Sequence, residues 1–101
     1  MSNPTTSSGG AMPPATDLPG IQRQIHEFIT MNFLFDGSGG AFDDNESLMA
    51  QGILDPTGFL ELALFVEDGW GIIVNQDDLN PDNFDTVGAL ADYVLRHLQN
   101  L

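Results

Sequence analysis

The sequence contains no cysteine, which excludes disulfide bonds, thiolate metal sites and cysteine nucleophiles together. Basic residues are scarce: two lysine or arginine residues stand against 15 aspartate or glutamate residues, for a formal net charge of −13. Such a chain repels phosphate backbones and anionic lipid headgroups, which argues against binding to nucleic acid or to a membrane surface. There is no apolar run long enough to span a bilayer and no pattern of a secretory signal, so we expect a cytoplasmic protein.

Length and composition indicate one folded domain. The chain has 101 residues, 42% of them hydrophobic, which suffices for a single modest core. Residues 1–18 are mainly Ser, Thr, Gly, Pro and Ala and offer almost nothing to bury, so we expect a disordered leader there. The folded domain is expected to occupy residues 19–101.

Apolar residues recur at helical spacing in three segments, at about residues 18–35, 56–68 and 86–101. A short helical turn is expected near residues 81–84, and a short extended piece at residues 72–74. This pattern predicts an all-α fold, a four-helix bundle of three main helices plus one short helix with a long first loop.

The long connection at residues 36–54 is not expected to be structureless. Loops of this length in a compact domain usually carry a function or packing anchors. Apolar residues are spaced along this one, and we expect them to pin it to the core: Phe42, Leu48, Met49, Ile53 and Leu54.

The start of the second helix reads GILDPTGFLEL. Asp55 suits the N-cap and Pro56 suits the first helical position. The helix is apolar nearly all the way round, which in so small a domain predicts an apolar strip left for a partner. Of Phe59 and Leu60, one is expected to face the core and the other the surface, while Gly58 leaves room for a docked enzyme to approach.

Three stretches occur in a specific order: DDNESLMAQGILD, TGFLELALFVEDGWGI and DDLNPDNFDTVGALADYV. Together with the strong acidity, they resemble the acyl carrier proteins and the aminoacyl (peptidyl) carrier proteins of the stand-alone bacterial type. The resemblance covers about residues 19–99, nearly all of the expected folded part.

The resemblance implies a four-helix bundle with a 4'-phosphopantetheine arm on a serine at the start of the second helix. The thiol of that arm would hold an acyl or aminoacyl group as a thioester. The implied partners are enzymes with basic surface patches, such as ligases, transferases and synthases, and the protein is expected to be a monomer. Docking on those partners is expected to involve Phe59, Leu60, Glu61, Glu67 and Asp68.

The chain departs from the family at the attachment position. The serine that follows Asp55 in the family aligns here with Pro56, which has no hydroxyl and cannot form the phosphodiester. Thr57 is a weak alternative for attachment, because it is β-branched and turned by about 100° around the helix axis. As written, the chain is therefore expected to carry no cofactor.

Three interpretations of this departure remain open. In the first, the protein docks on carrier-recognising enzymes without an arm of its own. In the second, it is an ordinary carrier in which position 56 is normally serine and is blocked here by Pro56. In the third, it is an acidic helical interaction module without a carrier role.

The sequence does not favour an enzyme. His26 lies on the polar side of the first helix and His97 in the last turn of the final helix, while Ser38 and Ser47 have no histidine nearby. Trp70 is expected to pack at the end of the second helix.

No metal site is expected either. An EF-hand loop beginning at Asp36 would need glycine at its sixth position and glutamate at its twelfth, where this chain has Ala41 and Ser47.

Overall fold

The computed structural model describes residues 13–34 and 42–100, and within those ranges all regular structure is helical. Three longer helices, one short helix and one 3-10 turn occur there, with no strand: α1 (Leu18–Phe33), α2 (Gly58–Trp70), η2 (Gln76–Asp78), α3 (Pro81–Phe84) and α4 (Val87–Gln99). The predicted all-α class, with three main helices, one short helix and a long first loop, is confirmed. The extended piece predicted at residues 72–74 is irregular chain and not a strand.

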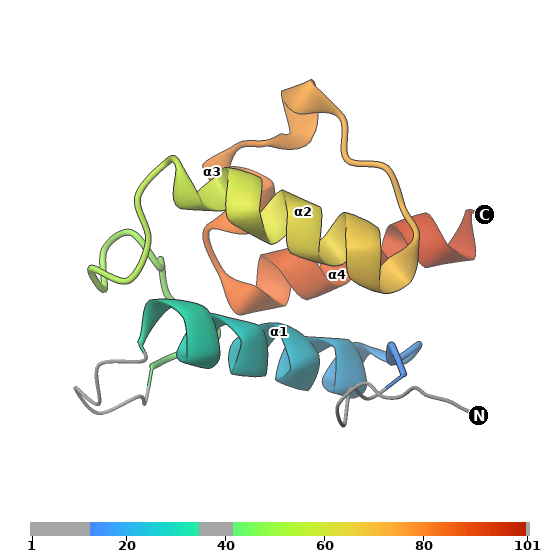
Figure 1. Ribbon diagram of the computed structural model, residues 1–101, viewed down its shortest axis with the longest axis horizontal. Helices are drawn as coiled ribbons and strands as arrows, with labels where there is room; N and C mark the ends of the chain where they lie inside the picture. The colour runs from blue at the N-terminus through green and yellow to red at the C-terminus, as the bar shows by residue number, and fades with distance from the viewer. Residues whose placement is uncertain (1–12, 35–41, 101) are drawn as a thin grey trace, which may run out of the picture.

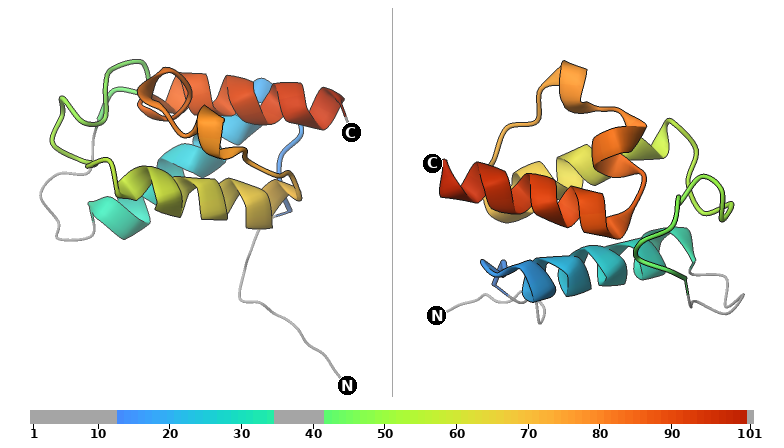
Figure 2. Two further views of the ribbon diagram at one scale, coloured as in Figure 1. Left: turned by 90° about the horizontal axis from the view of Figure 1, so that it is seen from above. Right: turned by 180° about the vertical axis from the view of Figure 1, so that it is seen from behind.

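The three longer helices surround one core. In Figure 1, α2 and α4 run in about the same direction and α1 runs opposite to both. Helix α1 packs most closely against α4, and α3 sits on α4 as well. Figure 2 shows the same arrangement from above and from behind. No helix in the described part of the chain is both long and apolar enough to cross a membrane.

The core is built from the apolar stripes of these helices. Ile21, Ile25 and Ile29 repeat every four residues along α1 and are fully buried. The expected stripe of α4 is buried over most of its length, and Thr86 caps this helix by accepting a hydrogen bond from the Ala89 N–H at 2.9 Å. The helical periodicity of the sequence therefore identified the faces that meet.

The long loop is held in place by one buried carboxylate. Asp85, between α3 and α4, accepts a hydrogen bond from the Ser47 hydroxyl and another from the Met49 N–H at 2.9 Å. The Asp85 carbonyl accepts a third from the Leu48 N–H at 2.6 Å. Leu48 and Leu54 are buried, as expected of anchors. In the described part of the loop, residues 42–54, Leu48 and Leu54 thus belong to the core, and Phe42, Met49 and Ile53 are partly buried against it.

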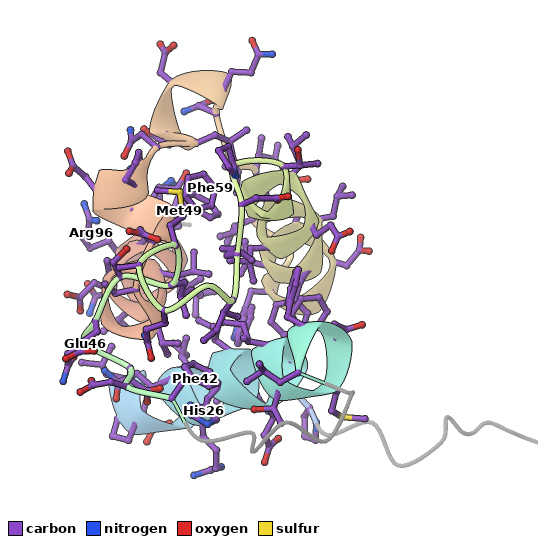
Figure 3. All side chains as sticks on the ribbon, turned by 90° about the vertical axis from the view of Figure 1, so that its left-hand side faces the viewer. His26, Phe42, Glu46, Met49, Phe59 and Arg96 are labelled. Atoms are coloured by element: carbon purple, nitrogen blue, oxygen red, sulfur yellow. The ribbon has the colours of Figure 1, made fainter. Side chains whose placement is uncertain are left out.

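A second set of contacts joins Phe42 and Asp44, at the start of the described part of the loop, to His26 of α1. The Nδ1 atom of His26 lies 2.6 Å from Asp44 Oδ1, and the His26 ring stacks on Phe42 with centroids 4.1 Å apart. Figure 3 shows His26 and Phe42 side by side at the surface of α1. The Asp44 carbonyl also accepts from the Gly88 N–H at 3.0 Å, so Asp44 links the loop to α4 too.

Residues 13–17, which were expected to belong to the leader, contact the helices. The indole N–H of Trp70 donates to the Ala15 carbonyl at 2.6 Å, and the Gln24 side chain bonds to Ala15 N–H and Pro13 carbonyl, each at 2.8 Å. Residues 13–17 are therefore fastened to α1 and α2, because their backbone groups find partners there. The rest of the expected leader, residues 1–12, lies outside the described residues.

Tyr93 ties the η2 turn to α4, because its hydroxyl donates to Asp78 Oδ2 at 2.8 Å. Burial raises the pKa of Tyr93 from 10.0 to about 12, and the hydrogen bond to Asp78 and its charge act in the same direction. The unfolded chain then loses this proton first as the pH rises. Protonated Tyr93 therefore contributes fully to the free energy of unfolding below pH 10, and this contribution is lost between about pH 10 and about pH 12.

We expect the free energy of unfolding to fall between pH 10 and pH 12, and Tyr93→Phe to flatten that fall. The chain has one tyrosine and no lysine, so Tyr93 is the one side chain expected to titrate in this window. Urea unfolding at a series of pH values, with phenolate absorbance as a second signal, measures the effect. A parallel fall in both proteins would show that Tyr93 does not cause it.

Candidate functional site

The turn that leads into α2 lies at the surface. Asp55, Pro56 and Thr57 are exposed, and they precede the first helical residue, Gly58. Asp55 Oδ1 accepts from the Gly58 N–H at 3.0 Å, and the Asp55 carbonyl accepts from the same N–H at 2.8 Å. Asp55 was expected to be the N-cap and Pro56 the first helical residue, but the N-cap of α2 is Thr57, the helix begins at Gly58, and it ends at Trp70 instead of Asp68.

Phe59 must be removed from the expected docking residues. Its side chain is 6% exposed and packs toward Phe84, with ring centroids 6.2 Å apart. Figure 3 shows Phe59 pointing into the core. Leu60 is 54% exposed, so the expectation that one of the pair faces the core and the other the surface is confirmed.

The acidic residues of α2 divide into two groups. Glu61 and Asp68 are exposed. Glu67 is half-buried, and its carboxylate accepts a hydrogen bond from the Val74 N–H at 2.8 Å. Glu67 therefore holds the chain after α2 in place, whereas Glu61 and Asp68 keep exposed carboxylates.

The room beside Gly58 is filled by the chain itself. A Cβ atom at Gly58 would lie 2.5 Å from Leu54 Cδ1 and 2.8 Å from Leu54 Cγ. The glycine thus lets the loop cross the start of α2. The expectation that Gly58 admits a docked enzyme is wrong, because Leu54 already occupies the space.

Two hollows follow one another along the α1 and α2 pair. The first, of about 460 Å³, lies by the start of α2 and is lined by Phe33, Gly52, Ile53, Leu54, Asp55, Thr57, Gly58 and Glu61. The second, of about 570 Å³, lies further along and is lined by Phe28, Asn32, Glu61, Leu64, Phe65, Asp68 and Gly69. Glu61 lines both hollows, so they adjoin at this residue.

The second hollow combines aromatic rings with carboxylates. Phe28 of α1 and Phe65 of α2 stack with ring centroids 4.0 Å apart, and Trp70 meets Phe65 edge-on at 5.6 Å, the packing expected for Trp70. Leu64 lines this hollow and is 60% exposed. Leu64 was not among the residues expected at this surface, although its spacing of four from Leu60 places both on one side of α2.

The residues considered for catalysis are engaged elsewhere. His26 pairs with Asp44, and His97 Nδ1 lies 2.9 Å from the Tyr93 carbonyl. The Ser47 hydroxyl is bonded to Asp85. Ser38 lies outside the described residues. Across residues 13–34 and 42–100, no three His, Cys, Asp or Glu side chains gather as a metal site would require.

No protein-family model matches this chain, and no curated protein matches it at a significant level.

Proposed function

We propose that this chain is a carrier-type protein, similar to the acyl and aminoacyl carrier proteins, that docks on biosynthetic enzymes through the exposed side of α2. With proline at position 56, it does so without a phosphopantetheine arm. The observation that carries the proposal is the exposed Asp55–Pro56–Thr57 turn at the N-terminal end of α2.

The position of this turn suits the chemistry of carrier proteins. An exposed residue that precedes a helix can be reached by a modifying enzyme, and the helix N-terminus favours the negative charge of a phosphodiester. Proline keeps the turn, since its fixed φ is compatible with a helix start, but it supplies no hydroxyl. The same substitution therefore preserves the fold and removes the attachment.

Thr57 is exposed and has a hydroxyl, so it must be tested as an alternative. Its hydroxyl is displaced along and around the chain from the position that a serine at 56 would take. An enzyme that aligns its reacting atoms closely tolerates such a displacement poorly. We expect Thr57 to remain unmodified.

A loading assay tests the proposal. The wild-type chain, Pro56→Ser and Pro56→Ala are each incubated with coenzyme A and a broad-specificity phosphopantetheinyl transferase, and intact masses are measured. We expect Pro56→Ser to gain one phosphopantetheine, while the wild type and the matched control Pro56→Ala gain none, because only the serine provides a hydroxyl at that position.

Each other outcome contradicts part of the proposal. If Pro56→Ser keeps the wild-type helix content and stays unloaded, the carrier-type assignment is overturned. If the wild type is loaded, the arm-less assignment is overturned, and loss of loading in Thr57→Ala would identify Thr57 as the attachment residue.

A further inference from the structure

The segment at residues 13–15, Pro-Pro-Ala, is held against the helices through its backbone. Gln24 of α1 accepts a hydrogen bond from the Ala15 N–H and donates one to the Pro13 carbonyl, each at 2.8 Å. The indole N–H of Trp70, at the end of α2, donates to the Ala15 carbonyl at 2.6 Å. Figure 1 and Figure 2 show the start of the described chain beside the end of α2. Side chains of two helices thus bind three backbone groups of one short segment.

The two prolines prepare this segment for such contacts. Neither has a backbone N–H, so Ala15 supplies the one backbone donor of the three residues, and Gln24 accepts it. Proline also fixes its own φ and favours polyproline II in the residue before it, which lowers the entropy lost when the segment is held. Domains that bind proline-rich peptides exploit the same low entropy cost and place aromatic side chains against the peptide.

Gly20 restricts which residue can follow the prolines. It is buried at the start of α1, and a Cβ atom there would lie 2.7 Å from Ala15 Cβ. Ala15 therefore lies close to bare helix backbone, and it is partly buried against the core. This close approach leaves little room for a side chain larger than a methyl group at position 15.

We propose that Gly20, Gln24 and Trp70 form a recognition site for a Pro-Pro-Ala segment in a polyproline II conformation. Residues 13–15 fill this site in the chain itself, and an exposed segment of the same chemistry in a partner protein can displace them. Because residues 13–15 precede α1, they can leave the site without unfolding a helix.

A partner protein fits this site better than a second copy does. A second copy would bring the same segment, but each copy has a formal net charge of −13, and this charge opposes association. The site lies at the C-terminal end of α2, whereas position 56 precedes the N-terminal end. The inference is therefore independent of the proposed function.

The release of residues 13–15 can be measured at Trp70. The chain has one tryptophan, so a single indole N–H cross-peak in the NMR spectrum reports on the site. We expect this proton to exchange with water at least about tenfold faster in Ala15→Glu than in the wild type, because the larger side chain does not fit beside Gly20 and the indole loses its acceptor. Thr16→Glu is the matched control, since Thr16 is exposed, and it should exchange as the wild type does.

The peptide acetyl-Pro-Pro-Ala-amide tests recognition in trans, because it carries the three backbone groups that Gln24 and Trp70 bind. We expect it to shift the indole cross-peak of full-length Ala15→Glu and to slow the exchange, with half-saturation in the millimolar range, since three hydrogen bonds with little apolar burial give weak binding. The wild type should need at least about tenfold more peptide, because its own segment competes at a high effective concentration.

Two matched controls test the specificity of this binding. Acetyl-Pro-Pro-Leu-amide should bind Ala15→Glu at least about tenfold more weakly, because leucine lacks room beside Gly20. Adding Gln24→Ala to Ala15→Glu should abolish the response to the Ala peptide, whereas adding Gln99→Ala, at an exposed position of α4, should not change it.

Wild-type exchange in Ala15→Glu, or an unchanged cross-peak with about 20 mM Ala peptide, would overturn the proposal. Equal binding of the Leu peptide would overturn the role of Gly20. A wild-type dimer in sedimentation that Ala15→Glu abolishes would overturn the assignment to a partner protein, since a second copy would then fill the site.

A second variant keeps the test decisive if circular dichroism shows that Ala15→Glu has lost helix content. Pro13→Gly with Pro14→Gly keeps the Ala15 methyl group and only loosens the segment. We expect about tenfold faster indole exchange in this variant and the same response to the Ala peptide, because glycine restores the chain entropy that proline removes. Wild-type exchange in this variant, or no response to the peptide, would likewise overturn the proposal.

Discussion

Replacing Asp85 with alanine should lower the free energy of unfolding by about 3 kcal/mol. The substitution removes the acceptor of the Ser47 hydroxyl and of the Met49 N–H, and the Met49 N–H is then left in the protein without its partner. Hydrogen bonds to a charged group are stronger than neutral ones, and a buried donor without a partner adds its own cost.

Urea unfolding of Asp85→Ala, measured beside Asp92→Ala, checks this expectation. Asp92 is exposed on α4, so its replacement changes the net charge equally without touching the loop. Asp92→Ala should differ from the wild type by less than about 0.5 kcal/mol. Similar losses in the two variants would mean that Asp85 does not hold the loop.

A second variant, Ser47→Ala, separates the contribution of the Ser47–Asp85 hydrogen bond from that of the whole Asp85 side chain. Ser47→Ala removes one donor to Asp85 and leaves the Met49 bond in place, so it should cost about 1 kcal/mol. Because both residues belong to the same network, the double variant Ser47→Ala with Asp85→Ala should be less destabilised than the sum of the two single variants. Full additivity would contradict the bond between them.

Leu48→Ala is expected to have an effect of comparable size, a loss of about 3 kcal/mol in the free energy of unfolding. Leu48 is fully buried although it lies in the long loop, and alanine would leave a cavity among the core side chains. Its backbone N–H bond to the Asp85 carbonyl does not involve the side chain and should persist.

The neighbouring Met49 provides the matched control for this cavity. Met49 is half-buried, and its N–H bond to Asp85 likewise survives truncation of the side chain, so Met49→Ala should cost about 1 kcal/mol or less. Thermal unfolding followed by circular dichroism compares the two. If both variants lose the same stability, Leu48 is not the anchor that its burial indicates.

The two sets of variants also bear on the candidate site. The loop that Asp85 and Leu48 hold ends at Leu54, whose side chain occupies the space beside Gly58 at the start of α2. Loosening the loop would therefore move a wall of the first hollow.

Much of the candidate site could be predicted from the sequence. A helix start near Asp55 and the placing of Glu61 for docking were expected, and Asp55 and Glu61 are exposed. The start of α2 at Gly58 was not expected, and the sequence left open which of Phe59 and Leu60 faces outward. Phe59 and Glu67 were both expected on the docking surface, but Phe59 is buried beside Phe84 and the half-buried Glu67 accepts a hydrogen bond from the Val74 N–H. Their sequence neighbours do not reveal those contacts.

By itself, the sequence determined that three main segments and one short segment are helical, and that position 56 has no hydroxyl. These features depend on residues within a few positions of one another. Only the tertiary structure decided which residues at long separation meet, such as Ser47 with Asp85, 38 positions apart, and Trp70 with Ala15, 55 positions apart. It also decided the two hollows along α1 and α2, because a hollow exists only where neighbouring elements leave their facing side chains incompletely covered.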